Sequence, residues 1–418
     1  MNPRAAAASG TAGNGSAWVI LALGALSAVA PVSIDLYLPG LPQIAGELAG
    51  GDARAQLTLS AFLLGFGIGQ LLHGPLSDRF GRRGPILAGM TVFTAASVGC
   101  ALASDLDSII AFRFLQALGG CAGPVLARAS VRDRYEADHA ARMLSLMMLV
   151  MSVAPMLAPM LGGQLVALFG WRSTFWALAL FGAVCVAVTA VAVDESLPPA
   201  RRAGGSPAQM LRDYGKLLSH RQFMGYTLAS GLVFAGMFAY IAASPFVFIT
   251  LYGVAPQHYG FLFGLNVLGI MLMGAINGRL VVRLGAERLL RWGVTGAALA
   301  GTALAVVGWT GWGGLVGLMI PLFGFISTIG LVAANAMARS LALFPQRAGT
   351  ASALAGTIQF GFGALSGAAA GALADGTARP MTLVMGVAGL ASLAILHLLV
   401  RRGPVSAPGG SGPSSRAP

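Results

Sequence analysis

The sequence predicts an all-α membrane protein with twelve transmembrane helices arranged in two six-helix halves. Three observations predict this fold class. Of the 418 residues, 56% are hydrophobic and only 10% are charged, against about 25% charged residues in an ordinary soluble domain. The apolar residues gather in runs of about 20, the length of a membrane-spanning helix. The basic residues lie almost entirely in alternate connections between these runs.

The spans are found by breaking the chain at charged residues and at clusters of glycine and proline. The runs lack the strict apolar–polar alternation of a barrel strand, so they predict helices. Each run is long enough to cross a bilayer. The predicted spans are 17–38, 56–76, 85–103, 108–128, 143–168, 174–193, 223–244, 259–281, 289–308, 313–336, 349–373 and 380–400.

The segment before the first span, residues 1–16, is small and polar, and we expect it to be disordered in the cytoplasm. A cleaved signal peptide is the competing interpretation of the run that follows. That run is too long for a signal peptide and continues into Asp35 and a proline-rich end, and further apolar runs follow directly. The first run is therefore predicted to be a transmembrane helix.

The placement of basic residues predicts the orientation. With the N-terminus inside, 22 of the 26 basic residues lie in inner segments, three in outer segments, and Arg113 within a span. Such a bias is typical of cytoplasmic loops. We therefore expect a multi-pass protein of the cell inner membrane with both termini cytoplasmic. The net charge of +12 does not indicate nucleic-acid binding, because the arginines are spread over many short loops.

The longest internal connection, residues 194–222, lies between the sixth and seventh spans and is rich in proline and glycine. It predicts a cytoplasmic linker between an N-terminal half at 17–193 and a C-terminal half at 223–400. The tail, residues 401–418, is rich in Gly, Pro and Ser. Such a composition is typical of a flexible segment, and we expect it to be disordered in the cytoplasm.

Several motifs stand at fixed places in this pattern. Residues 74–83 read G-P-L-S-D-R-F-G-R-R, and 278–287 repeat part of that motif in the other half as G-R-L-V-V-R-L-G-A-E. A repeat of six-helix halves is typical of one large class of transporters. The first span ends with D-L-Y-L-P-G-L-P-Q-I-A from Asp35. Residues 154–163 read A-P-M-L-A-P-M-L-G-G, and the fourth span carries R-F-L-Q from Arg113.

In these motifs the chain resembles the major facilitator superfamily, and within it the drug:proton antiporters of the Bcr/CflA type, which confer bicyclomycin and chloramphenicol resistance. The resemblance covers about residues 17 to 400, and the loop motif is its most specific part. The chain departs from the pattern at Ala117 and Ala158, where glycine is usual. The resemblance implies the major facilitator fold and an alternating-access transporter.

The resemblance further implies proton-coupled efflux of drug-like, lipophilic small molecules, chloramphenicol- or bicyclomycin-like compounds among them. The expected partners are the lipid bilayer, protons and such a substrate, and we expect a monomer. A proton-coupled metabolite exporter or importer of the same fold remains an alternative. An integral membrane enzyme is an alternative of another class, and it would need clustered histidines or acids at a membrane face, which the sequence lacks.

Asp35 is the only acid within the twelve predicted spans, and Arg113 is the only arginine within them that does not lie close to the inner end of its span. A charge at bilayer depth costs about 2.5–3.5 kcal/mol on insertion scales, so it is expected to face a cavity or a partner. We interpret Asp35 as the proton carrier and Arg113 as the residue that modulates it. The alternatives are a hydrogen-bonding acid near the outer end of its helix and an arginine that extends to the outer interface.

Two further groups are expected to serve the conformational change. The loop motif resembles a latch between the halves, in which Gly74 permits close helix contact and Gly81 a tight turn; topological anchoring is its alternative. The prolines and glycines of the fifth span predict a pivot against the other half, with plain packing as the alternative. The latch residues are Gly74, Asp78, Arg79, Gly81, Arg82 and Arg83, and the pivot residues are Pro155, Pro159, Gly162 and Gly163.

Aromatic and polar residues within the spans are candidates for substrate binding, because apolar pockets with a few polar groups suit lipophilic ligands. Core packing and interhelical hydrogen bonding are the alternatives for each of them. The candidates are Tyr37, Phe62, Phe66, Gln70, Gln116, Phe238, Tyr240 and Gln359.

No cofactor or metal is expected. The sequence has no G-x-x-x-x-G-K-[ST] loop, and its five histidines are scattered without metal-ligand spacing. Its three cysteines lie inside apolar runs, as small packing residues do. Hydrolytic chemistry is therefore not indicated, and we expect that the protein is not an enzyme.

Overall fold

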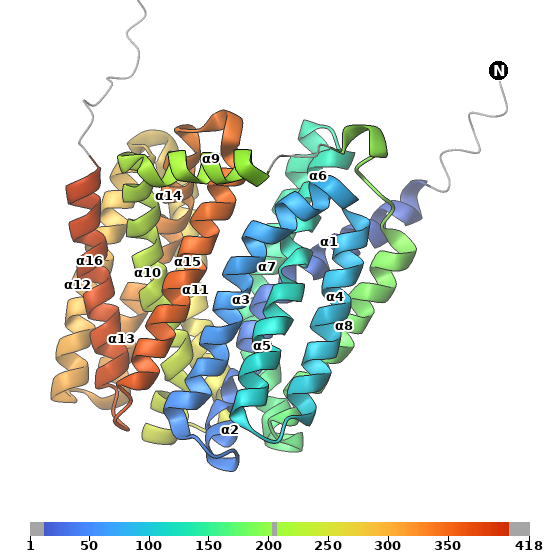
Figure 1. Ribbon diagram of the computed structural model, residues 1–418. Helices are drawn as coiled ribbons and strands as arrows, with labels where there is room; N and C mark the ends of the chain where they lie inside the picture. The colour runs from blue at the N-terminus through green and yellow to red at the C-terminus, as the bar shows by residue number, and fades with distance from the viewer. Residues whose placement is uncertain (1–11, 203–206, 401–418) are drawn as a thin grey trace, which may run out of the picture.

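The computed structural model describes residues 12–202 and 207–400, and these residues form the predicted all-helical membrane fold (Figure 1). Within the described residues, twelve helices or helix pairs are long and apolar enough to cross a membrane. The helices are α1 (Ala12–Asp35), α2 (Leu41–Glu47), α3 (Gly51–Phe80), α4 (Arg83–Leu102), α5 (Leu106–Gly120), α6 (Ala122–Arg134), α7 (Ala137–Phe169), α8 (Arg172–Ala192), α9 (Pro207–Ser219), α10 (Arg221–Pro245), α11 (Pro256–Leu284), α12 (Ala286–Thr310), α13 (Gly314–Ser327), α14 (Ile329–Ala342), α15 (Ala348–Ala372) and α16 (Arg379–Leu399).

Several connections are themselves helical. Short 3₁₀ turns η1, η2 and η4 cover Leu38–Gly40, Pro199–Arg201 and Pro345–Arg347, and a π-helical turn η3 covers Phe246–Leu251 directly after Pro245. Proline removes a backbone donor, so a change of helix type at this point has a local cause.

The helix boundaries differ from the expected ones in two places. α1 begins at Ala12, within the segment expected to be disordered, whereas residues 1–11 and the tail 401–418 lie outside the described residues. The linker contains the helix α9, which packs on α10 and α15 through the buried Leu217. This burial of an apolar side chain stabilises the helix and explains why it forms in a segment rich in helix-breaking residues.

The fourth span of each half is divided into two helices at the same relative place. α5 gives way to α6 at Cys121, and α13 gives way to α14 at Thr328, 207 positions later. Gly119 lies against Gly89 at the first break, where a Cβ atom would stand 2.4 Å from the Gly89 carbonyl oxygen. Close backbone contact of this kind is available only to glycine. The repeat of two six-helix halves therefore extends to the breaks within a span.

α1 to α8 pack against one another as one group, and α10 to α16 pack as a second group. The groups meet along a seam formed by two helix pairs, α3 with α15 and α7 with α11. η1, which directly follows the end of α1, also contacts α10 and α11. The seam thus joins the second and eleventh spans and the fifth and eighth spans.

The seam is closed at the end of the bundle that carries α2 (the α2 end) and open at the end that carries α9 (the α9 end). Gly260 of α11 packs on the backbone of Met160, and Gly264 faces the side chain of Met156. Leu149 lies on the same face of α7 as Met160, nearer the α9 end, and is 56% exposed. In Figure 1, α3 and α15 diverge toward the α9 end.

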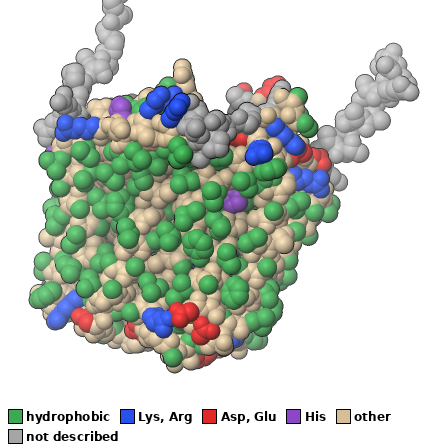
Figure 2. All heavy atoms as spheres, viewed as in Figure 1, with side chains coloured by type: hydrophobic (Ala, Val, Ile, Leu, Met, Phe, Trp, Pro, Cys, Tyr) green, Lys and Arg blue, Asp and Glu red, His purple; other side chains and the backbone are tan. Residues whose placement is uncertain are grey.

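Charged side chains gather at the two ends of the bundle, with hydrophobic side chains between them, on the face shown in Figure 2. The three arginines expected outside all lie at the α2 end and have partners there. Arg54 pairs with Asp107, Arg172 pairs with Glu47 at 3.2 Å, and Arg379 stacks on Trp309 with 5.2 Å to the ring centroid.

The expected orientation places the α9 end in the cytoplasm, and reporter fusions test it. A reporter that is active only in the cytoplasm should be active when fused after Arg401, because the positive-inside bias fixes the last span. The same reporter fused after Phe169, at the α2 end, should be inactive and serves as the control. An active periplasmic reporter after Arg401 would overturn the orientation.

Candidate functional site

Asp35 is the last residue of α1 and lies at the closed part of the seam, where it is 3% exposed. The residues after it turn into η1 and contact α10 and α11 of the other half. The acid is therefore buried where the two halves meet.

The guanidinium of Arg113 is fully buried on α5 between two aromatic rings. Its Cζ atom lies 4.2 Å from the ring centroids of both Tyr37 and Phe62. Nη1 donates to the Ser33 carbonyl at 3.0 Å and to Gln116 Oε1 at 2.6 Å. Desolvated cation–π contacts are worth about 2 kcal/mol or more. This arginine is therefore held inside the N-terminal half and does not extend to the interface.

Asp35 and Arg113 do not form an ion pair, and none links them among the described residues. Arg113 contacts Ser33 and Tyr37, which lie two residues before and after Asp35. The contact with Ser33 is made to its backbone carbonyl, and Tyr37 lies beyond the end of α1, so Arg113 packs against the end of this helix without an ion pair or hydrogen bond to the acid. The structure therefore places both expected residues at the same level of the bundle but does not pair them.

A row of five aromatic side chains crosses the seam. Phe62 contacts Phe66 on α3, Phe66 lies 4.7 Å from Phe360 on α15, and Phe360 lies 5.6 Å from Phe238 on α10. Phe234 completes this aromatic row at 6.5 Å from Phe238. Three of the expected substrate-binding residues, Phe62, Phe66 and Phe238, are thus brought together, and the row begins at the ring that covers Arg113.

The other expected substrate-binding residues are divided by the structure. Gln70 faces Gly356 across the seam, and Gln359 lines a pocket with Phe234 between α10, α14 and α15. Tyr37 and Gln116 are fully buried around Arg113. In this arrangement, these two side chains support the arginine and are not accessible from the open end.

Tyr240 belongs to a separate aromatic cluster in the C-terminal half. It stacks on Phe263 at 5.6 Å, and its hydroxyl accepts a hydrogen bond from Asn266 Nδ2 at 3.1 Å. Phe248 and Tyr259 complete this tyrosine cluster. The Tyr259 hydroxyl bonds Ser244 Oγ at 2.8 Å. The cluster forms the wall that Asp35 faces across the seam.

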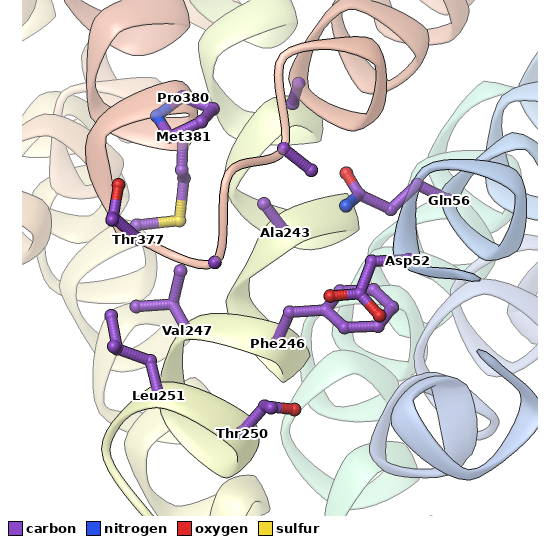
Figure 3. A pocket seen from close by; sticks show the side chains of 13 residues that line it. Asp52, Gln56, Ala243, Phe246, Val247, Thr250, Leu251, Thr377, Pro380 and Met381 are labelled. Atoms are coloured by element: carbon purple, nitrogen blue, oxygen red, sulfur yellow. The ribbon is translucent and has the colours of Figure 1, made fainter. Parts of the chain in front are cut away.

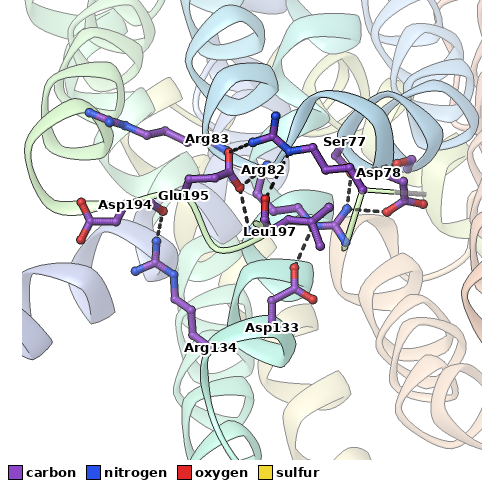
Figure 4. A network of polar contacts seen from close by, with 11 residues as sticks. Ser77, Asp78, Arg82, Arg83, Asp133, Arg134, Asp194, Glu195 and Leu197 are labelled. Carbon is purple, nitrogen blue, oxygen red and sulfur yellow. Dashed lines mark hydrogen bonds and ion pairs between the residues drawn. The ribbon is translucent and has the colours of Figure 1, made fainter. Parts of the chain in front are cut away.

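The loop motif forms a polar network at the α9 end (Figure 4). Arg82 pairs with Asp78 at 2.7 Å and with Asp133 of α6 at 2.8 Å, and its Nη1 donates to Ser77 at 2.5 Å. Its backbone N–H donates to Glu195 Oε1 at 2.8 Å. This loop-motif network ties α3, α4, α6 and the start of the linker together within the N-terminal half.

Glu195 is the part of this network that sequence reasoning missed. Partial burial raises the pKa of its carboxyl, but hydrogen bonds from the N–H groups of Arg82, Leu197 and Arg83 outweigh burial and leave the pKa below its ordinary value. The resulting stabilisation is present above the ordinary pKa and is lost only when the pH falls through the lowered pKa. The carboxylate therefore stays ionised near neutral pH.

Gly81 and Gly74 have different roles from each other. Gly81 has a φ of +88° and a Cβ atom there would stand 2.2 Å from Glu195 Oε2, so glycine is required for the turn and its partner. No atom lies within 4 Å of the place where a Gly74 Cβ would stand. The expectation that Gly74 permits close helix contact is wrong in this conformation, because the seam is open beside it. Arg79 lies over the ring of Phe80, at 5.4 Å.

The C-terminal half carries a second ionic cluster that the degenerate repeat motif does not predict. Glu287, at the start of α12, accepts from Tyr226 at 2.7 Å and pairs with Arg291 at 2.8 Å and with Arg339 of α14 at 3.4 Å. In the loop-motif network, Arg82 at a turn pairs with the acid Asp133 on the fourth span. In this cluster, the acid Glu287 near a turn pairs with Arg339 on the tenth span. The signs of the charges are inverted, which explains why the two segments do not align there.

The expected pivot on α7 lies in close backbone contact on two sides. A Cβ atom at Gly162 would stand 1.9 Å from the Leu36 carbonyl oxygen, and one at Gly163 would stand 2.4 Å from the Pro256 carbonyl oxygen of the other half. Pro159 and Pro155 lie inside the same helix, respectively one and two turns nearer the α9 end than the glycines. Gly163 therefore permits close contact between the halves, and Gly162 permits it with α1.

Arg128 was counted among the loop arginines, but α6 carries it within the fourth span. Its Nε donates to the Pro124 carbonyl of its own helix at 3.0 Å. The side chain is exposed although protein surrounds it on most sides, so it lies in a recess of the surface.

In the described ranges 12–202 and 207–400, no group of three or more His, Cys, Asp or Glu residues is placed to hold a metal ion. The geometry instead combines a buried acid, a buried arginine and an aromatic row along a seam that is open at one end. Together, the two six-helix halves and this seam define a membrane transporter.

The chain belongs to the major facilitator superfamily, whose family model matches residues 21–368. It is similar to a Bacillus subtilis (strain 168) protein named uncharacterized MFS-type transporter YdgK, with 38% identity over 383 residues, 91% of this chain and 95% of that protein. It is also similar to a Haemophilus influenzae protein named bicyclomycin resistance protein homolog, with 32% identity over 388 residues, 92% of this chain and 96% of that protein. The expected resemblance to the Bcr/CflA type is thereby confirmed.

Among solved structures, the fold is similar to a partially occluded inward-open conformation of the xylose transporter XylE from E. coli. The TM-score is 0.71 with 13% identity, and the match covers 92% of this chain and 97% of that one. At this identity the likeness shows the fold alone. The chain is a transporter and not an enzyme, as the sequence predicts.

Proposed function

We propose that this protein exports drug-like small molecules from the cytoplasm in exchange for protons, by alternating access to the two sides of the inner membrane. The observation that carries the proposal is the position of Asp35, the one acid of the predicted spans, buried at the closed end of the seam. A carboxyl group there can hold a proton while one side is closed and release it when the halves part. The bicyclomycin resistance relative supports the drug substrate.

The open α9 end supports a cytosolic route to the seam. A substrate that enters there meets the aromatic row, whose rings suit a lipophilic body. A monomer contains the whole proposed route, because both halves belong to one chain. The residues 17–193 and 223–400 act as the two moving halves in this proposal, and 194–222 connects them.

Proton coupling supplies enough energy for resistance. One proton driven by about 100 mV supplies about 2.3 kcal/mol, and one pH unit adds about 1.4 kcal/mol. One proton for each neutral substrate therefore sustains a gradient of a few hundredfold.

The proposal is tested by expressing the protein in a host that lacks its own drug pumps and measuring resistance to a panel of antibiotics, with uptake into everted vesicles in parallel. We expect resistance to neutral, lipophilic compounds and vesicle uptake that collapses when the pH gradient is removed. Uptake that is driven in the opposite direction would favour the metabolite importer of the same fold. No change in resistance and no transport would overturn the proposal.

The loop-motif network gives a separate prediction. Asp78→Asn removes one charge that Arg82 binds, while the Asp133 and Glu195 contacts of that arginine remain. The Asp78 side chain is 55% exposed, and exposed ion pairs contribute about 0–1 kcal/mol to stability. We therefore expect normal membrane insertion and drug efflux reduced about tenfold, because the change shifts the equilibrium between the two conformations.

Asp138→Asn, on the exposed first turn of α7 at the same end, is the matched control and should leave efflux unchanged. Immunoblots of the membrane fraction measure the amount of each variant. If Asp78→Asn transports at the wild-type rate, the loop is a topological anchor and not a latch.

A further inference from the structure

A pocket lies at the α2 end, on the line where the two halves meet (Figure 3). It encloses about 420 Å³ between its walls, part of it open to solvent. Asp52 and Gln56 of α3 form the wall from the N-terminal half. The opposite wall comes from η3, from the end of α15 and from the start of α16, through Phe246, Val247, Met381 and their neighbours.

Two polar groups of this pocket are acceptors without donors. Gln56 is 2% exposed, and its Oε1 atom is buried with no hydrogen-bond partner. Asp52 is half-buried, and it makes no ion pair or hydrogen bond with any described residue. Burying an acceptor without a donor is unfavourable, so such an atom indicates a missing partner. In Figure 3, the amide of Gln56 points into the space, with the Asp52 carboxylate beside it.

The charges around the pocket favour a cationic partner. Asp52 stands in the first turn of α3, where the helix dipole favours a negative charge, but its partial burial disfavours a charge without a partner, and a cation beside it would remove that penalty. The nearest outer arginines are engaged elsewhere, since Arg54 pairs with Asp107 and Arg379 stacks on Trp309. The remaining wall is apolar, with a phenylalanine and a methionine that suit the body of a small organic molecule.

We propose that this pocket binds a small organic cation with N–H donors on an apolar body, such as an alkylammonium or an alkylguanidinium, and that the bound cation holds the α2 end closed. The N–H groups reach the Asp52 carboxylate and Gln56 Oε1, and the apolar body lies against Phe246 and Met381. The placement of this pocket on the outer face rests on the orientation in the proposed function.

The second part of the proposal follows from where the pocket lies. Beside it, α3 and α15 are in contact, since a Cβ atom at Gly371 would stand 3.0 Å from the Ala53 carbonyl oxygen and 3.2 Å from Gln56 Cβ. A ligand that contacts both α3 and η3 adds bonds that exist only while the halves meet. It therefore binds the closed arrangement better than the open one and shifts the equilibrium toward it.

The test measures binding and inhibition separately. Equilibrium dialysis of the purified full chain with radiolabelled phenethylammonium should show one saturable site. Asp52→Asn and Gln56→Leu should each weaken binding at least about tenfold, because each removes one partner of a desolvated charged group. Asp105→Asn, which removes an exposed acid at the same end outside the pocket and keeps a residue that can cap α5, should bind within about twofold of the wild type. Gel filtration confirms that each variant is folded.

Neutral 2-phenylethanol, which has a similar shape, should not displace the labelled cation. Phenethylammonium added to the outer side of proteoliposomes should inhibit drug transport in the wild type and in Asp105→Asn, but not in Asp52→Asn. Equal binding by the wild type and both pocket variants would overturn the site, and binding without inhibition would overturn the closure. If the chain transports no drug, the dialysis result still decides the site, so the two proposals fail separately.

Discussion

Asp35→Asn is expected to abolish proton-driven transport. Asparagine has nearly the same size but cannot release a proton, so the step that couples the halves to the gradient is lost. Drug binding is expected to remain within about twofold of the wild type, because the substitution leaves every ring of the aromatic row unchanged. The measurement is pH-gradient-driven uptake in proteoliposomes, with equilibrium binding of chloramphenicol in parallel.

Downhill exchange separates this prediction from simple loss of folding. An Asp35→Asn protein that is folded should still exchange labelled for unlabelled drug without a gradient, and Asp35→Glu should keep part of the uphill activity. Asp107→Asn, an exposed acid at the same end, is the control and should transport normally. If Asp35→Asn still concentrates drug, the proton is carried by another group.

Arg113→Lys is expected to reduce transport at least about tenfold although it retains the charge. Lysine has no planar group to lie between Tyr37 and Phe62, and its ammonium stands at a different place from Nη1, which makes both hydrogen bonds to Ser33 and Gln116. An unpaired buried acceptor costs about 1–3 kcal/mol, so the end of α1 that carries Asp35 loses its support. The measurements are drug efflux and the midpoint of thermal unfolding.

A matched control exists at the α2 end. Arg172 also lies 4.2 Å from an aromatic centroid, that of Trp171, but its side chain is 43% exposed. Arg172→Lys should leave efflux and the unfolding midpoint nearly unchanged, because exposed cation–π contacts are worth about 0.5–1 kcal/mol. Wild-type efflux by Arg113→Lys would show that charge alone suffices at that position.

The twelve spans were predictable because the bilayer imposes one simple requirement, about 20 apolar residues for each helix. The breaks at Cys121 and Thr328 were not, because they depend on backbone contacts such as that of Gly119 with Gly89. Hydropathy reports how apolar a segment is and contains no information about its neighbours.

The candidate site was predicted in part for a similar reason. Asp35 and Arg113 were identified because charged residues are scarce in the spans, but the absence of an ion pair between them depends on how the helices pack. Phe360 was missed because a phenylalanine in an apolar span carries no signal until its neighbours across the seam are known. The cluster around Glu287 was missed because its charges are inverted relative to those of the loop motif. A residue-by-residue alignment compares single positions, so it does not detect an ion pair in which both partners have exchanged sign.

The contact between Gly163 and Pro256, like that between Gly260 and Met160, is made by backbone atoms. A side chain of any other type would have to displace the main chain, so these positions leave little room for mutational drift. The phenylalanines of the aromatic row touch only through their rings, and leucine or methionine can fill similar volumes there. In a laboratory selection for a new antibiotic spectrum, substitutions should accumulate along the row and be purged at the glycines. The helix contacts made by these glycines are therefore expected to resist substitution, whereas the aromatic row is expected to tolerate it.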